Sequence, residues 1–275
     1  MGRLGAALAV LLGWAGAAAA CGTAGGVCAV DGGSYRIVLP DAAAGSLPAV
    51  VFLHGYGGSG AGILKNKALV QAVTGRGYAL IAPDGTMRSS GSRRSWVFRP
   101  HSQGRDEARF FAEVLEDAAQ QFGVDAAATV LAGFSSGAFM VNYLACSTPD
   151  LFAAYAPVSG SFWRPQPEAC AGPVRLFHTH GWSDGVVPLE GRPLGGGRFL
   201  QGDAFAGLEL WRQTNGCASH APQKRWQEGE YMMRSWDCGP GADIRLALFP
   251  GGHMVPDGWT SLMLDWVESG AVQPR

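Results

Sequence analysis

Three side chains, at positions 135, 184 and 253, have the types and the order needed for nucleophilic catalysis. Ser135 lies within the sequence GFSSG at residues 133–137, and Asp184 and His253 follow it. A serine hydroxyl is a weak nucleophile at neutral pH, so it needs an adjacent base and a third group that orients the base. The order serine, acid, histidine therefore predicts Ser135 as nucleophile, Asp184 as acid and His253 as base.

The G-x-S-x-G pattern around Ser135 owes its meaning to its position between a strand and a helix. The apolar run 129–132 predicts a strand directly before the pattern, and residues 138–145 have helical character directly after it. In that setting the pattern is typical of a nucleophile elbow, a sharp turn at which side chains beside the serine would clash. The same pattern arises by chance in chains as glycine-rich as this one, which has 41 glycines, so the context decides.

The predicted acid and base each follow the end of an apolar run that reads as a strand. Both lie in loops that contain glycine. The carboxyl ends of parallel strands meet at one edge of a sheet, where active sites gather. Glu190 and Asp203 are alternative acids, although each lies farther from the strand end. In the alternative without chemistry, Asp184 is a turn residue and His253 a surface histidine.

A glycine-rich turn, HGYGG at residues 54–58, follows another predicted strand. Such a turn supplies one backbone donor for the oxyanion of an acyl-transfer intermediate, and the residue after the nucleophile supplies the second. We therefore expect the N–H groups of Tyr56 and Ser136 to form the oxyanion hole. His54 itself is expected to be structural.

The elements that must position these residues alternate between short apolar runs and helical patterns. Several runs are apolar throughout, as in strands buried on both faces. The predicted strands are 35–39, 49–53, 79–82, 129–132, 154–158, 174–177 and 244–249, and the predicted helices include 111–122, 204–215 and 258–268. This alternation predicts an α/β fold, a mostly parallel central sheet with helices on both faces. No internal repeat is present.

Composition excludes several classes of function. The formal net charge is −1, with 21 basic and 22 acidic side chains, so we expect neither nucleic acid nor an anionic membrane as partner. The hydrophobic content of 47% excludes a disordered chain. His178 and His180 are the only pair that suggests a metal, and we expect no metal and no cofactor.

The N-terminal residues have the layout of a secretory signal peptide. Arg3 supplies a positive charge, an apolar stretch follows, and small residues at 17–20 precede Cys21. We predict a signal peptide over 1–20 and a single catalytic domain over 21–275, with no later membrane span. The mature protein is then secreted or periplasmic, and we expect a monomer.

The six cysteines suit an oxidising compartment. A lipid anchor at Cys21 would leave one thiol unpaired, so we favour its disulfide. Connectivity cannot be deduced from sequence alone. We favour pairs in sequence order: Cys21–Cys28, Cys146–Cys170 and Cys217–Cys238.

With these motifs together, the chain resembles secreted esterases of the α/β-hydrolase superfamily, of the polyhydroxybutyrate depolymerase-like and feruloyl esterase-like groups. The resemblance covers nearly the whole predicted mature chain and rests on residues 28–40, 54–58, 83–85, 133–137, 180–188 and 251–256. It implies cofactor-free hydrolysis of carboxylic esters by Ser135, Asp184 and His253. The cysteines around 146/170 and 217/238 also resemble that family's. Ser136, Trp182 and the sequence RRSW at 93–96 depart from the family pattern, which puts the substrate in doubt.

The region between two predicted strands, residues 160–173, is too short for a large lid. An open cleft suits bulky esters, and Tyr56, Phe134, Trp163 and Trp182 are candidates for an aromatic wall against the substrate. We expect polyhydroxyalkanoate-type oligoesters or feruloyl and other aryl esters, with aromatic polyesters as a conceivable side activity. Because no granule-binding domain is expected, soluble esters are favoured over crystalline polyester.

Arg93 and Arg94 are candidate contacts for a substrate carboxylate, although a solvated loop is the favoured interpretation. Two other functions share the same residues: a serine peptidase on this scaffold, and a binding protein on a hydrolase fold without catalysis. Comparing the rates of peptide and ester hydrolysis distinguishes a peptidase from an esterase. Labelling by a serine-directed phosphonate separates the second.

Overall fold

The computed structural model describes residues 21–23, 26–42, 45–88, 91, 93–99 and 102–270. The predicted signal peptide, residues 1–20, lies outside the described residues. Within them, no helix combines the length and apolar character that crossing a membrane requires.

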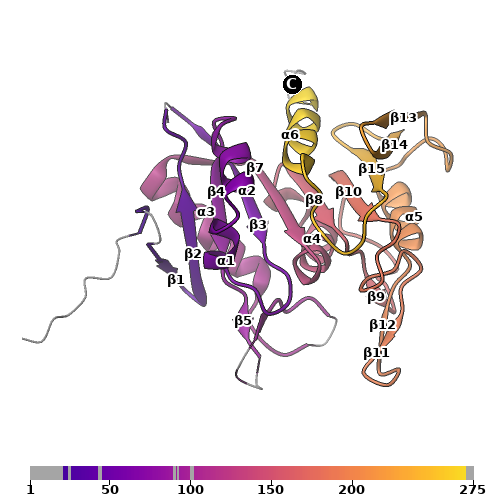
Figure 1. Cartoon of the computed structure of the whole chain (residues 1–275), viewed down its shortest axis with the longest axis horizontal. Helices are drawn as coiled ribbons and strands as arrows, with labels where there is room; N and C mark the ends of the chain where they lie inside the picture. Colours follow the sequence, from indigo (N-terminus) through magenta and orange to yellow (C-terminus); the bar gives the residue numbers. More distant parts are fainter. Residues whose placement is uncertain are drawn as a thin grey trace, which may run out of the picture.

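A ten-stranded sheet runs through the centre of the molecule in the order β1-β2-β4-β3-β7-β8-β10-β15-β14-β13 (Figure 1). The six strands from β4 to β15 in this order are parallel, and the two at each edge are antiparallel. The mostly parallel sheet predicted from the sequence is thus confirmed. Its strands are β1 Cys28–Val30, β2 Gly33–Val38, β3 Leu47–Leu53, β4 Ala79–Pro83, β7 Val124–Phe134, β8 Ala154–Val158, β10 Arg175–Gly181, β13 Lys224–Glu228, β14 Tyr231–Asp237 and β15 Asp243–Phe249.

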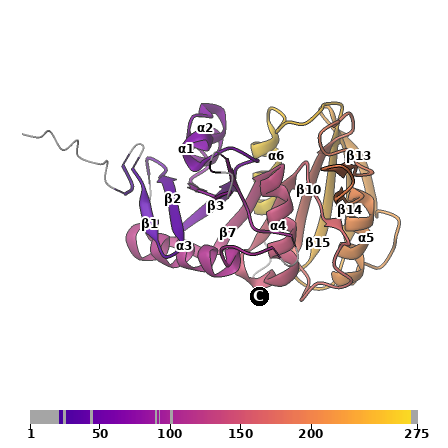
Figure 2. The ribbon, with the colours of Figure 1, turned by 90° about the horizontal axis from the view of Figure 1, so that it is seen from below.

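Helices cover both faces of the sheet (Figure 2). In β3, Val51 and Leu53 join the core beneath α3, α4 and α5, whereas Val50 and Phe52 join the core beneath α2 and α6. Because both faces of such a strand are buried, its sequence is apolar without alternation. The helices are α1 Gly60–Leu64, α2 Lys67–Thr74, α3 Glu107–Phe122, α4 Ser136–Ser147, α5 Ala204–Thr214 and α6 Trp259–Gly270, with a short 3₁₀ turn η1 at Pro149–Leu151.

All seven predicted strands are present, but one boundary was wrong in a way that matters for the site. The prediction ended a strand at Phe177, whereas β10 continues through His178 and His180 to Gly181. Both histidines therefore lie within β10, buried, and not beyond its end. The predicted strand ended too early because His178 and His180 are polar.

Three of the four antiparallel edge strands, β1, β13 and β14, were not predicted, whereas β2 matches the predicted strand 35–39. β13 carries mostly exposed polar residues, so its apolar content gives no signal. It pairs with β14 through a turn at Gly229, which has a positive φ of 56°. The glycine at this turn was the available signal for the hairpin.

Two minor sheets border the carboxyl edge of the main one. β5 (Thr86–Met87) pairs with β6 (Arg94–Ser95), and β9 (Trp163–Arg164), β11 (Pro193–Leu194) and β12 (Phe199–Gln201) form a three-stranded sheet. No large lid is present among the described residues, as predicted. The segment after β8 instead contributes β9 to the small sheet.

Three disulfides tie the loops to the core, with the pairing favoured above: Cys21–Cys28, Cys146–Cys170 and Cys217–Cys238. The second joins the end of α4 to the segment after β9. The third joins the end of α5 to the end of β14.

Candidate active site

The structure brings Ser135, His253 and Asp184 into one hydrogen-bonded chain. His253 Nε2 lies 2.9 Å from Ser135 Oγ, and His253 Nδ1 lies 2.7 Å from Asp184 Oδ2. Ser135 follows β7, Asp184 follows β10, and His253 follows β15. The three therefore meet at the carboxyl edge of the sheet, although 118 positions separate the serine from the histidine.

Ser135 occupies a strained turn between β7 and α4. Its φ of 56° and ψ of −115° lie in a region that L-residues rarely adopt, at a cost of about 1–3 kcal/mol. The neighbouring backbone holds it there: its N–H donates to Val158 O at 3.0 Å. A Cβ at Gly137 would lie 2.4 Å from Leu53 O, and one at Gly133 would lie 2.8 Å from Gly137 C. Glycine is thus required on both sides, as the elbow predicts.

Asp184 is a buried carboxylate whose hydrogen bonds hold one of its oxygens next to His253. Its Oδ1 accepts from the N–H groups of Val186 and Val187 at 2.9 and 2.8 Å, which leaves Oδ2 for His253. Burial by itself raises the pKa of Asp184, but these bonds and the histidine outweigh it and lower the pKa below its usual value. The group therefore remains charged where it can orient His253 and stabilise its protonated form.

Behind the acid, two buried histidines form a second hydrogen-bonded chain. His180 Nε2 lies 2.7 Å from Val187 O, and His180 Nδ1 lies 3.2 Å from His178 Nε2. Because a carbonyl only accepts, His180 must carry its proton on Nε2, and His178 must donate its own Nε2 proton to His180. Burial, followed by the neighbouring imidazole, lowers the pKa of His178 to about 3, and burial also lowers the pKa of His180.

This neutral pair holds the loop that presents Asp184. The two histidines hydrogen-bond to each other. No group of three or more metal-ligating side chains occurs in the described part of the chain. His180 Nε2 also lies 3.8 Å from Asp184 Oδ2.

The two expected oxyanion donors stand beside Ser135. Ser136 is the first residue of α4, where backbone N–H groups lack partners within the helix. The N–H of Tyr56 donates to no acceptor among the described residues. Both N–H groups are therefore available to a ligand at this site, and their role in an oxyanion hole stays a prediction.

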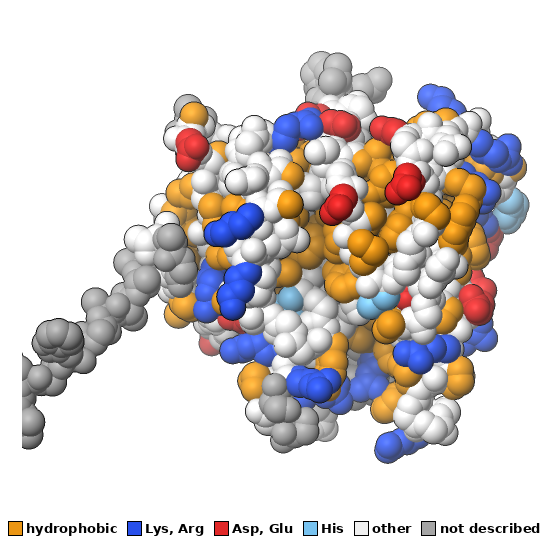
Figure 3. Space-filling view, in the orientation of Figure 1, with side chains coloured by type: hydrophobic (Ala, Val, Ile, Leu, Met, Phe, Trp, Pro, Cys, Tyr) orange, Lys and Arg blue, Asp and Glu red, His pale blue; other side chains and the backbone are white. Residues whose placement is uncertain are grey.

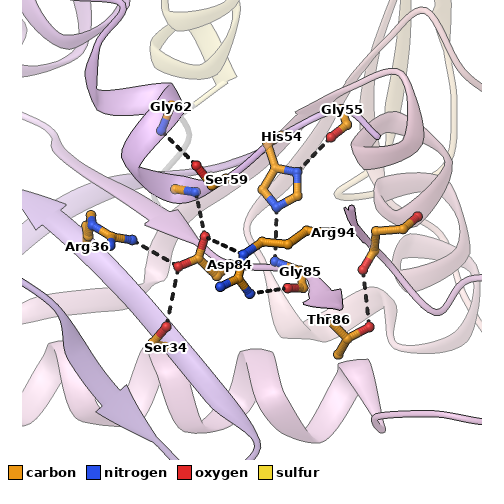
Figure 4. Close-up of polar contacts among 12 residues, drawn as sticks. Ser34, Arg36, His54, Gly55, Ser59, Gly62, Asp84, Gly85, Thr86 and Arg94 are labelled. Carbon is orange, nitrogen blue, oxygen red and sulfur yellow. Dashed lines mark hydrogen bonds and ion pairs between the residues drawn. The ribbon is translucent and has the colours of Figure 1, made fainter. Parts of the chain in front are cut away.

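A polar cluster supports the loop that carries Tyr56 (Figure 4). Asp84 accepts from Gly60 N–H at 2.8 Å and from Arg36 Nη1 at 2.9 Å, and Ser34 Oγ lies 3.4 Å away. Burial alone raises the pKa of Asp84, but these donors lower it overall. Arg94, considered above for substrate binding, instead lies 3.8 Å from Asp84. Its interactions are therefore largely within the protein.

His54 belongs to the same support, as predicted. Its Nδ1 donates to Gly55 O at 2.7 Å, and its Nε2 accepts from Gly85 N–H at 3.0 Å. Trp96 Nε1 donates to the backbone carbonyl of His54 at 2.9 Å. Burial lowers the pKa of His54, so the ring is neutral and each nitrogen has its partner.

Two cavities flank the Ser135–His253 pair. The one that we call the nucleophile-side cavity has a volume of about 430 Å³ and contains Ser135, Ser136 and Tyr56 in its lining. The other, the histidine-side cavity, has a volume of about 480 Å³ and is lined by His253 and residues of α1, α2 and α6. Both volumes lie in the range of small-molecule sites.

The predicted aromatic wall is divided between these cavities. Tyr56 and Trp163 line the nucleophile-side cavity, and Phe134 lines the histidine-side cavity, where its ring centre lies 4.7 Å from that of His253. Trp182 lines neither and is 48% exposed. These substrate contacts stay predictions.

Sequence reasoning missed several residues of the nucleophile-side cavity: Phe98, Arg99, Phe139, Arg192 and Phe199. Phe139 follows the nucleophile by one helical turn, so its place in α4 was a usable signal. Phe199 lies in β12 beyond three glycines that turn the chain from β11. The path of the loop that carries Arg99 has no periodicity from which to predict it.

The family model described as phospholipase/carboxylesterase matches residues 36–194, more than half of the chain. Among curated proteins, feruloyl esterase B of Piromyces equi is 26% identical over 77% of this chain, and poly(3-hydroxyalkanoate) depolymerase C of Paucimonas lemoignei is 28% identical over 44%. The chain spans only 40% and 30% of their lengths. An acetyl xylan esterase from Aspergillus awamori has a similar fold, with a TM-score of 0.64 at 18% identity over 86% of this chain and 93% of its own.

Proposed function

Since this chain belongs to the phospholipase/carboxylesterase family, of the α/β-hydrolase type, we propose that it is a serine carboxylic-ester hydrolase. Ser135 is the nucleophile, His253 the base and Asp184 the acid. The observation that carries the proposal is the unbroken chain from Ser135 Oγ through His253 to Asp184, with links of 2.9 and 2.7 Å.

The reaction begins when Ser135 Oγ attacks the ester carbonyl and His253 Nε2 takes the hydroxyl proton. Asp184 holds Nδ1–H in place and stabilises the imidazolium. The N–H groups of Tyr56 and Ser136 bind the oxyanion, and each such donor contributes about 10²- to 10³-fold to kcat. His253 then gives its proton to the leaving alcohol, and water releases the acyl group by the same steps in reverse order.

The two cavities divide the substrate between them. The nucleophile-side cavity contains Ser135 and both oxyanion donors, so it receives the acyl group. The histidine-side cavity is lined by His253, the group that protonates the leaving oxygen, so it receives the alcohol. An acyl cavity that includes Tyr56 and Trp163 suits aryl acids such as a feruloyl group, or the units of a hydroxyalkanoate oligoester.

Secretion and a monomeric state are part of the proposal. Three disulfides suit an oxidising compartment. Cys21 pairs with Cys28, which favours a disulfide over a lipid anchor at that cysteine. Secretion to the periplasm or the medium agrees with the signal peptide predicted for residues 1–20.

The test compares the native protein with S135A on p-nitrophenyl butyrate, methyl ferulate, a hydroxybutyrate trimer and a peptide p-nitroanilide. Ser147, exposed at the far end of the same helix, supplies a matched control. We expect ester hydrolysis by the native protein and S147A and none by S135A, and a fluorophosphonate should label Ser135. Faster peptide turnover would indicate a peptidase, and folded native protein without turnover or labelling would indicate a binding protein.

A further inference from the structure

Three arginines in the nucleophile-side cavity have no acidic partner. Arg88, Arg99 and Arg192 are the only charged residues in its lining, and none forms an ion pair with any described residue. Among the other arginines of the described chain, about half pair with carboxylates; those that do are Arg36, Arg76, Arg94, Arg105, Arg109, Arg175 and Arg212. A protein of net charge −1 thus concentrates uncompensated positive charge beside its nucleophile.

Arg99 is the best placed of the three to bind a ligand. Its guanidinium carbon lies 4.1 Å from the centre of the Phe199 ring and 5.7 Å from that of Trp163. Stacking on a ring restricts the guanidinium and leaves the N–H groups at its edge free to donate. Such an edge matches the two oxygens of a carboxylate.

The surroundings make an unpaired charge at Arg99 costly. The side chain is half-buried, and burial, followed by the charge of Arg88, lowers its pKa. A partly desolvated cation without a counter-charge is unfavourable unless an anion offsets it. In the same lining, Trp163 Nε1 and Gln201 Oε1 are buried without a hydrogen-bond partner in the described residues. One donor and one acceptor in this cavity are therefore available to a ligand.

An aromatic cluster lies in the same cavity as Ser135 and Arg99. The ring centres of Phe98, Phe139 and Trp163 lie 5.5 to 6.0 Å from one another. A flat acyl group can pack on these rings. On the surface, Lys and Arg side chains gather over the lower part of the face drawn in Figure 3, where β5 and β12 lie in Figure 1.

We propose that the acyl group preferred at this site is aromatic and carries a carboxylate remote from the scissile ester, which Arg99 binds. The substrate class is a monoester of an aromatic dicarboxylic acid. Arg88 and Arg192 add positive potential that favours entry of the anion. The inference rests on the proposed function, because it assigns the acyl group to the cavity that contains Ser135.

The experiment compares two substrates that differ only in charge: monomethyl terephthalate and methyl 4-carbamoylbenzoate, in which an amide replaces the carboxylate. We expect the native protein to prefer the carboxylate by about 10- to 100-fold in kcat/KM, the range for hydrogen bonds between charged groups. The preference should fall with added salt. In R99Q the ratio of the two kcat/KM values should approach one.

Arg198 supplies the matched control, since it lies 5.8 Å from the centre of the same Phe199 ring but does not line the nucleophile-side cavity. R198Q should keep the native ratio. Equal rates on the two esters, or hydrolysis of neither by protein active on p-nitrophenyl butyrate, would overturn the inference and leave the esterase proposal standing. If the folded native protein did not hydrolyse p-nitrophenyl butyrate, the proposed function itself would be refuted.

A second measurement avoids any dependence on the folding of R99Q. Terephthalate and terephthalamide are compared as competitive inhibitors of p-nitrophenyl butyrate hydrolysis by the native protein. Tighter inhibition by the dianion supports the inference, and equal inhibition contradicts it. A carboxylate preference that R99Q retains would show that the anion binds elsewhere.

Discussion

The buried histidine pair behind the acid makes stability depend on pH in a way that one substitution can isolate. We expect H178Q to remove part of the acid sensitivity of the native protein. Glutamine places its amide nitrogen close to the position of the histidine Nε2, so it keeps a donor for His180 Nδ1 but cannot take up a proton in this pH range.

The magnitude follows from the difference between the folded and unfolded pKa of His178. Its pKa is about 3 in the folded protein and about 6.5 in an unfolded chain. Between these values the unfolded chain binds more protons at this site, so the free energy of unfolding falls as the pH falls, by up to about 1.4 kcal/mol per pH unit. From pH 7.5 to pH 4.5 this site alone removes about 3 kcal/mol.

A protonated His178 has no acceptor for its additional proton among the partners described. The nearest titratable group is His180, which accepts the existing Nε2 proton and is itself bonded to Val187 O. Asp184 lies on the far side of His180, where its negative charge favours protonation of that ring, not of His178. His178 is therefore a clearer probe of the pH dependence of stability than His180.

The assay is urea denaturation of the native protein and H178Q at pH 7.5, 6.5, 5.5 and 4.5, with disulfides oxidised. At pH 7.5 the substitution in a packed strand should cost about 1–2 kcal/mol of the free energy of unfolding. The two stability curves should converge as the pH falls, and H178Q should be the more stable protein at pH 4.5. Parallel curves over the whole range would refute the assignment of His178 as a buried neutral group.

Three further predictions follow from the site and the disulfides. D184N should lower kcat on p-nitrophenyl butyrate by about 10⁴-fold without unfolding the protein, because an amide favours the wrong tautomer of the catalytic histidine; a loss below tenfold would exclude this acid. G137A should reduce the free energy of unfolding by about 1–3 kcal/mol, because the new Cβ would approach Leu53 O to 2.4 Å; an unchanged denaturation midpoint would contradict this. Replacing Cys146 and Cys170 by serine should cost about 3 kcal/mol, since the bond closes a loop with a sequence separation of 24; calorimetry would show no shift if the loop were already fixed by packing.

The parts of the site that were predictable are those fixed by local constraint. Ser135 was identifiable because its turn excludes side chains at Gly133 and Gly137, and this restriction is written in the residue types themselves. Asp184 and His253 were identifiable as catalytic candidates because each follows a strand of a parallel sheet, whose buried strands have continuous apolar sequences. Their convergence then follows from the fold.

The parts that were not predictable depend on tertiary contacts. The strand was predicted to end before His178 and His180 because polar residues seldom occupy a central strand. Their burial is acceptable because they hydrogen-bond to each other and because His180 also bonds to Val187 O. Arg99 reaches the site on a loop, and Phe199 on a hairpin that packs beside it. Neither position is encoded in a periodic pattern, since both depend on where a loop folds back.

The electrostatics of the site separate catalysis from choice of substrate. The negative charge of Asp184 is enclosed by two backbone donors and His253, so it acts on the histidine and is shielded from the substrate. The positive charge of Arg99 has no such enclosure and faces the cavity that the acyl group would enter. Because the two groups lie on separate segments and share no hydrogen bond, changes at Arg99 should alter which ester is preferred while the Ser135–His253 distance is unaffected. The anion preference is thus a property that could change without loss of the triad.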